Sequence, residues 1–166
     1  MAELTTLESK LGEVIGLAMA AQDATKQVLR LLGEEDAPAL EQTVQRMHAE
    51  AADTERRATG VAAGFEGKKT AILEKAREVK AEAKEMRDAY LGNDADALDG
   101  FEFLTMAEAG EVGHWAIVGL LARKAGSAEV QTLAEWVKPI QQRHFEETLA
   151  GSLELARAED PAATPA

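Results

Sequence analysis

The segment Phe101–Leu121, FEFLTMAEAGEVGHWAIVGLL, decides how this chain folds. At about 100° per residue, its large apolar residues gather on one side of a helix. Glu111 lies near the centre of that side, with Leu104 and Val118 within about 20° of it. Glu108 falls about 60° away on the same side. The pattern predicts a long core-facing helix that carries two glutamates into the protein interior.

A lone carboxylate in a protein core is costly unless it is protonated, paired or bound to a cation. His114 follows Glu111 by one helical turn, and a carboxylate and an imidazole at this spacing can share a metal ion. The alternative is that Glu108 or Glu111 pairs with a buried arginine, or with water admitted beside Gly110 and Gly113. Both interpretations fit the residues.

The rest of the chain shows the same helical spacing of apolar residues. Asp36 and Ser127 are predicted to cap the second and the last helix, and Pro139 lies inside the last one. The predicted helices span residues 4–32, 70–91, 95–125 and 128–158. A further helix begins at about Pro38 and runs to a loop that Gly60, Gly64 and Gly67 predict at residues 60–69. The inserted helix at 70–91 is expected to turn its apolar residues inward: Ile72, Ala76, Val79, Ala83, Met86 and Tyr90.

These five helices predict an all-α fold in a single domain over residues 1–158. Four of them form a four-helix bundle, and the fifth is an additional helix in the middle connection. No alternation of apolar and polar residues with a period of two indicates a strand. Residues 159–166, which include Pro161 and Pro165, are expected to form a disordered tail.

The composition excludes several classes of function. The chain has no cysteine, so disulfides, thiolate chemistry and Cys-type zinc sites are absent. A net charge of −12 argues against nucleic acid as a partner, because phosphate binding needs a basic surface. No uncharged apolar run approaches the roughly 20 residues that span a bilayer, and residues 1–6 resemble no secretion signal. We expect a cytoplasmic protein with no membrane partner.

A dinuclear metal site also needs carboxylates from the helices that face Glu108 and Glu111. The first helix offers only Thr25 at mid-height, with Gln22 one turn earlier, and the second offers His48, Glu50 and Glu55 at the edges of its apolar stripe. On the last helix Gln141 precedes His144 by three residues, so an amide stands where a carboxylate would complete the motif. The candidate metal ligands are Glu108, Glu111, His114, Glu50, His48 and His144.

These residues resemble the YciE/YciF-type family of ferritin-like bacterial proteins, which are linked to stress responses. The similarity runs from about Ala18 to Ala156 and is best at EAGEV (108–112) and GSAEVQTLAEWV (126–137). DATKQVL (23–29) resembles the family's opening-helix motif, but Thr25 stands where the family has glutamate. Gln141 and Gln142 stand where it has a Glu-Glu pair.

The resemblance implies a ferritin-like bundle, often dimeric, with a di-iron or di-manganese site in members that keep the glutamates. One hypothesis is therefore a stress-associated homodimer that binds iron or manganese, with ferroxidase or peroxide-scavenging chemistry. The second is a non-catalytic structural or interaction protein that has lost its metal, in which Glu108 and Glu111 pair with His48, Gln22 or Gln141. A third, a nucleoid-associated miniature ferritin, conflicts with the acidic charge. No catalytic residue is assigned.

Overall fold

The computed structural model describes residues 2–33 and 35–164, and every regular element within them is an α-helix. The helix limits lie within about two residues of the predicted ones, except that the loop expected at 60–69 spans only residues 63–68 because α2 continues through Gly60 to Ala62. The all-α fold is thus confirmed. The helices are α1 (Thr6–Leu32), α2 (Pro38–Ala62), α3 (Lys69–Tyr90), α4 (Ala97–Ala125) and α5 (Ala128–Ala156).

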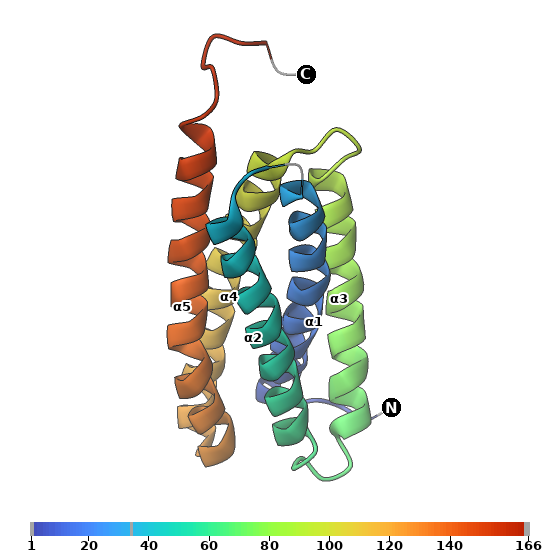
Figure 1. Ribbon diagram of the computed structural model, residues 1–166. Coiled ribbons are helices and arrows are strands. Elements are labelled where there is room, and N and C mark those ends of the chain that lie inside the picture. Colours follow the sequence, from blue (N-terminus) through green and yellow to red (C-terminus); the bar gives the residue numbers. More distant parts are fainter. Residues whose placement is uncertain (1, 34, 165–166) are drawn as a thin grey trace.

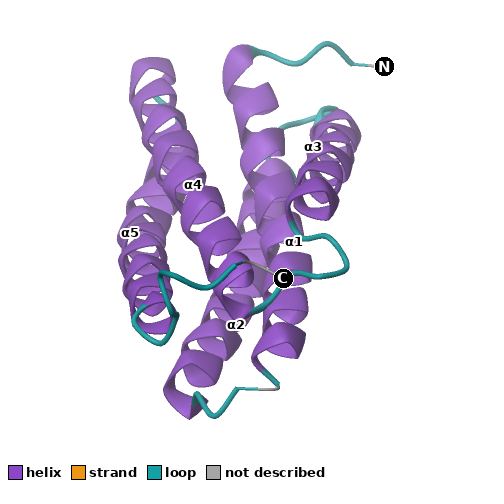
Figure 2. Cartoon of the chain, turned by 90° about the horizontal axis from the view of Figure 1, so that it is seen from above, coloured by secondary structure: helices purple, strands orange, loops and turns teal. Residues whose placement is uncertain are grey.

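The five helices lie side by side, and each runs opposite to the one before it (Figure 1). α4 packs most extensively on α5, while α1 contacts α2, α3 and α4, and α2 contacts α5. Seen from above, α3 lies at one side of α1, away from α5 (Figure 2). Helices α1, α2, α4 and α5 therefore surround a shared interior, and α3 packs on the outside of α1.

Local signals define most helix ends. Capping boxes begin α1 at Thr5 and α4 at Asp96, where side chain and backbone bond reciprocally across the first turn. Gly126, with a φ of 66°, ends α4 in the left-handed conformation that suits glycine. Of the two predicted caps, the one at Ser127 is confirmed in position and the one at Asp36 is wrong. Ala37 rather than Asp36 is the N-cap of α2, and Ser127 is the N-cap of α5 without a side-chain hydrogen bond.

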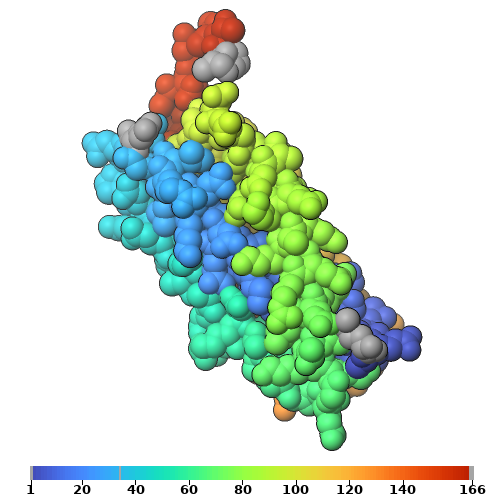
Figure 3. Space-filling view, turned by 90° about the vertical axis from the view of Figure 1, so that its right-hand side faces the viewer, coloured from blue at the N-terminus to red at the C-terminus, as the bar shows by residue number. Residues whose placement is uncertain are grey.

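Two glycines of α1 bring α3 very close. A Cβ on Gly12 would lie 2.8 Å from the carbonyl oxygen of Ile72, and one on Gly16 would lie 2.4 Å from that of Ala76. Only the first half of α3 is buried there. The prediction that Met86 and Tyr90 face inward is wrong, since they are 59% and 50% exposed. The reason is that α3 makes few contacts with α4, so its second half is only partly covered. Figure 3 shows α3, in green, beside the exposed surface of α1, in blue.

The interior is divided along the helix axes. One apolar cluster includes Leu11, Ile15 and Trp115, and a second at the opposite end includes Val28 and Phe101. The buried polar residues of α2, α4 and α5 fall between these clusters along their helices: Thr54, Glu108, Glu111, Gln141, His144 and Thr148. The fold thus places a polar layer in the middle of an otherwise apolar core.

Residues 157–164, which follow α5, form no helix. Residues 157–164 are exposed, and 165–166 lie outside the described residues, so the disorder of the tail 159–166 stays a prediction. None of the described helices is long and apolar enough to cross a membrane.

Candidate functional site

The polar layer contains the two glutamates of α4. Glu108 is 2% exposed and Glu111 is 4% exposed, which confirms that both lie inside the protein. Gln141 and His144, on the facing turns of α5, are 5% and 3% exposed. The candidate site is therefore built mainly between α4 and α5, the most extensively packed pair of helices.

His144 lies between two carboxylates. Its Nε2 is 2.5 Å from Glu50 Oε2 on α2, and its Nδ1 is 3.3 Å from Glu108 Oε2 on α4. Burial lowers the pKa of His144, but the contacts with Glu108 and Glu50 outweigh burial, and the net pKa is raised. Burial raises the pKa of Glu50, but His144 and the Arg143 guanidinium, 2.5 Å from Glu50 Oε1, bring it below its usual range.

Glu111 has a different environment. The side-chain amide of Gln141 donates a hydrogen bond to Glu111 Oε2. Burial and then the charge of Glu108 raise the pKa of Glu111 to about 8, against the opposing effects of Gln141 and His144. At neutral pH the Glu111 carboxyl is therefore mostly protonated. The two glutamates lie one turn apart on α4 but have different neighbours: Glu108 faces His144, whereas Glu111 pairs with Gln141.

Two oxygen atoms of this layer lack partners. Glu108 Oε2 and Gln141 Oε1 are buried and accept no hydrogen bond within the described part of the chain. Glu108 Oε2 faces His144 Nδ1 at 3.3 Å, but the pair does not meet hydrogen-bond geometry. Buried acceptors without partners are uncommon in native proteins and call for an explanation.

The other two predicted histidines lie elsewhere. His48 Nδ1 is 3.0 Å from Thr25 Oγ1 and 3.2 Å from the carbonyl oxygen of Gln22. The His114 side chain is 38% exposed, and its Nδ1 lies 3.7 Å from Glu13 on α1. The structure thus brings together Glu50, Glu108 and His144, with Glu111 one turn away. Among residues 2–33 and 35–164, no group of three or more His, Asp or Glu side chains is arranged to hold a metal ion.

Arg143 is the residue that the sequence interpretation missed. It follows Gln141 and Gln142 in the chain, and its bond to Glu50 joins α5 to α2. Its position beside a core-facing histidine was a possible signal. The acid that it reaches, 93 residues earlier in the chain, depends on how the helices pack.

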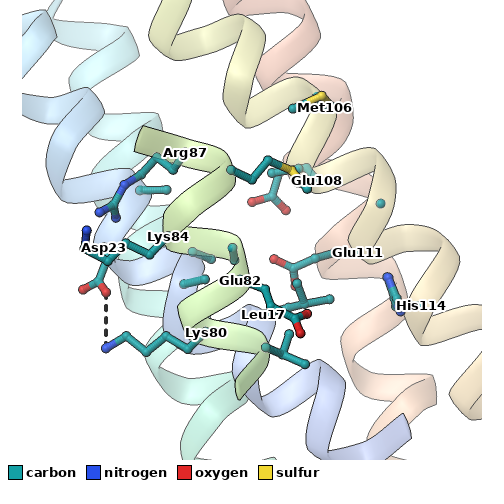
Figure 4. Close-up of a pocket in the computed structure, with 18 of the residues that line it drawn as sticks. Leu17, Asp23, Lys80, Glu82, Lys84, Arg87, Met106, Glu108, Glu111 and His114 are labelled. Atoms are coloured by element: carbon teal, nitrogen blue, oxygen red, sulfur yellow. Dashed lines mark ion pairs between the residues drawn. The ribbon is translucent and has the colours of Figure 1, made fainter. Parts of the chain in front are cut away.

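A groove leads to the two glutamates from the outside. It lies between α1, α3 and α4, has a volume of about 350 Å³ and is lined by apolar side chains such as Leu17, Val79 and Phe103. Figure 4 shows Glu108 and Glu111 on the α4 wall, opposite the Asp23–Lys80 ion pair on the far rim. The partly covered second half of α3 is one wall of this groove.

No protein-family model, curated protein or solved structure matches this chain. The fold and site define its class on their own: an all-helical protein with a buried carboxylate–histidine layer that a groove connects to the surface.

Proposed function

We propose that this protein is a ferritin-like bundle that binds one divalent cation, iron or manganese, between α4 and α5. Its topology supports the comparison with ferritin. The antiparallel pairs α1–α2 and α4–α5 are joined by one long connection, and ferritin-like bundles have one such crossover. Here the connection contains α3. The association with stress responses rests on the resemblance to the YciE/YciF-type family.

The observation that carries the proposal is the pair formed by Glu108 Oε2 and His144 Nδ1, 3.3 Å apart in the buried layer. Histidines that bind metals usually donate their other ring N–H to a carboxylate, and Glu50 is placed to accept it from His144. When the His144 proton is on Nε2, the unprotonated Nδ1 is an acceptor, and it faces Glu108 Oε2, which is also an acceptor. A proton or a cation between them removes this repulsion.

Glu108 and His144 would be the ligands, and Glu50 would orient the imidazole. Glu111 and Gln141, one turn away on the same helices, are further oxygen donors. Mixed oxygen and imidazole ligands suit iron and manganese, which when bound would supply a redox-active centre. The groove between α1, α3 and α4 provides a route from solvent.

One cation is proposed rather than two because α1 and α5 contribute no carboxylate to the layer, and Glu50 on α2 is already paired with Arg143 and His144. Thr25 occupies the α1 position, and its hydroxyl donates to the backbone of its own helix. Gln141 contributes an amide where a carboxylate would be needed. A second divalent ion would therefore lack compensating charge.

The experiment is metal analysis of protein purified without chelators, followed by calorimetric titration of the chelator-treated protein with Mn(II), and with Fe(II) under anaerobic conditions. Glu108→Gln should abolish binding, and Glu50→Gln should weaken it about 10- to 100-fold, as loss of a carboxylate behind a ligating histidine does. Glu55→Gln is the matched control, because Glu55 also lies on α2 but pairs with Gln22. A wild-type protein that stays empty in excess Mn(II) and Fe(II) refutes the proposal.

The second candidate function is a non-catalytic structural bundle. Its support is the neutral Glu111–Gln141 pair and the raised pKa of His144, which as an imidazolium would neutralise Glu50 and Glu108 without a metal. The same titration separates the two candidates. Metal-free protein with a protonated His144 at neutral pH, detected by NMR of the imidazole ring, favours the structural bundle.

A further inference from the structure

The outward face of α4 carries no polar side chain over most of its length. Between Glu102 and Arg123, the exposed residues of this helix are exclusively Met, Ala, Gly, Ile and Leu. Met106 is 41% exposed, Ile117 is 45% and Leu120 is 51%. At about 100° per residue, this face is centred opposite Glu111. A helix that is apolar on both its inner and outer faces is normally buried on both.

Two glycines at the middle of this face are not packed closely against any other part of the chain. A Cβ on Gly110 or Gly113 would meet no atom within 4 Å, so neither glycine is needed for close packing inside the protein. Each costs roughly 1 kcal/mol of helix stability relative to alanine. Small residues on an exposed helix face allow the backbone of a second helix to approach closely.

The two ends of the face carry opposite charges. Glu102 precedes the apolar stretch, and Arg123 and Lys124 follow it on the same side of the helix. A two-fold axis near Gly113 would place Glu102 opposite Lys124 of a second, antiparallel copy. The same axis would place Met106 opposite Leu120. The face is therefore complementary to itself, as the interface of a two-fold symmetric dimer must be.

We propose that the outward face of α4 is the interface of a homodimer in which two copies of α4 cross antiparallel at Gly113. The net charge of −12 makes two copies repel each other over most of their surfaces. At the outward face of α4, by contrast, the apolar residues carry no charge, and Glu102 of each copy would attract Lys124 of the other. The proposal does not rest on the metal site, because Glu111 lies on the other side of the helix, although Met106 and Gly110 of this face also line the groove between α1, α3 and α4.

The first test is the mass of the full-length protein in solution, measured by light scattering and sedimentation equilibrium at micromolar concentrations. We expect twice the chain mass of 17.8 kDa. Gly113→Leu should raise the dimer dissociation constant by about tenfold or more, because two leucines would collide at the axis. Gly60→Leu is the control: Gly60 is also an exposed helical glycine with nothing within 4 Å, but it lies on α2. Circular dichroism checks that both variants fold.

The second test addresses the orientation of the two helices. Glu102→Lys and Lys124→Glu should each weaken the dimer, and the double variant should restore it. A double variant that dimerises no better than the single ones overturns the antiparallel register. A wild-type protein that stays monomeric, or a Gly113→Leu dimer as tight as the wild type, overturns the interface.

Discussion

Replacing Glu111 by Gln tests the electrostatics of the buried layer most directly. The folded protein raises the pKa of Glu111 from its ordinary value of 4.5 to about 8. Between pH 4.5 and about 8 the folded protein keeps the Glu111 proton, whereas the unfolded chain releases it. The contribution of Glu111 to the free energy of unfolding is therefore largest below pH 4.5, and it is lost as the pH rises through about 8. The difference corresponds to roughly 5 kcal/mol of unfolding free energy, a large part of the stability of a domain this size.

Glutamine has the shape of the protonated carboxyl and does not titrate. At pH 5, Glu111→Gln should therefore leave the free energy of unfolding close to that of the wild type. At pH 9 the variant should be more stable by several kcal/mol, since the wild type then has an ionised carboxylate beside Glu108. His144, whose raised pKa also makes stability fall as pH rises, is present in both proteins, so its effect largely cancels in the difference.

The measurement is urea unfolding followed by circular dichroism at several pH values from 5 to 9, with chelator present and the free energies extrapolated to water. Glu55→Gln serves as the control for the loss of an acid outside the site. If the stability of the wild type and that of Glu111→Gln change in parallel with pH, Glu111 is ionised at neutral pH and the reasoning fails. Under the cation proposal, repeating the series with Mn(II) should flatten the wild-type curve.

Two further predictions concern packing and capping. Gly16→Ala should destabilise the protein by about 1–3 kcal/mol, because its Cβ would press on the backbone of α3. Gly60→Ala should instead stabilise the protein by up to about 1 kcal/mol. Urea unfolding measures both changes, and a stabilised Gly16→Ala variant would contradict the close approach of α1 and α3. Asp96→Ala should cost about 1 kcal/mol by removing the side-chain cap of α4, measured as a lower melting temperature, with Asp94→Ala as a control in the preceding loop.

The limits of the helices were predictable because their causes are local. Gly126 and the capping residues act within a single turn, and the spacing of Leu11, Val14 and Val28 is set by helix geometry alone. The burial of Glu108 and Glu111 followed from the same geometry, since the apolar side of a helix can be recognised without its neighbours. The sequence named Gln141 among the possible partners of these glutamates, and the structure confirms it for Glu111, but which partner each glutamate meets could not be predicted in this way.

What the sequence by itself determined is the all-helical fold and the two glutamates on the inner face of its fourth helix, because both depend on residues within a few turns of one another. Only the tertiary structure decided that Glu50, from a distant part of the chain, orients His144 beside Glu108, and that Gln141 pairs with Glu111. It also decided that α3 docks through Gly12 and Gly16 and leaves a groove over the site. The physical reason is that a side chain's direction follows from its own helix, whereas its neighbour depends on how two helices are rotated and shifted against each other.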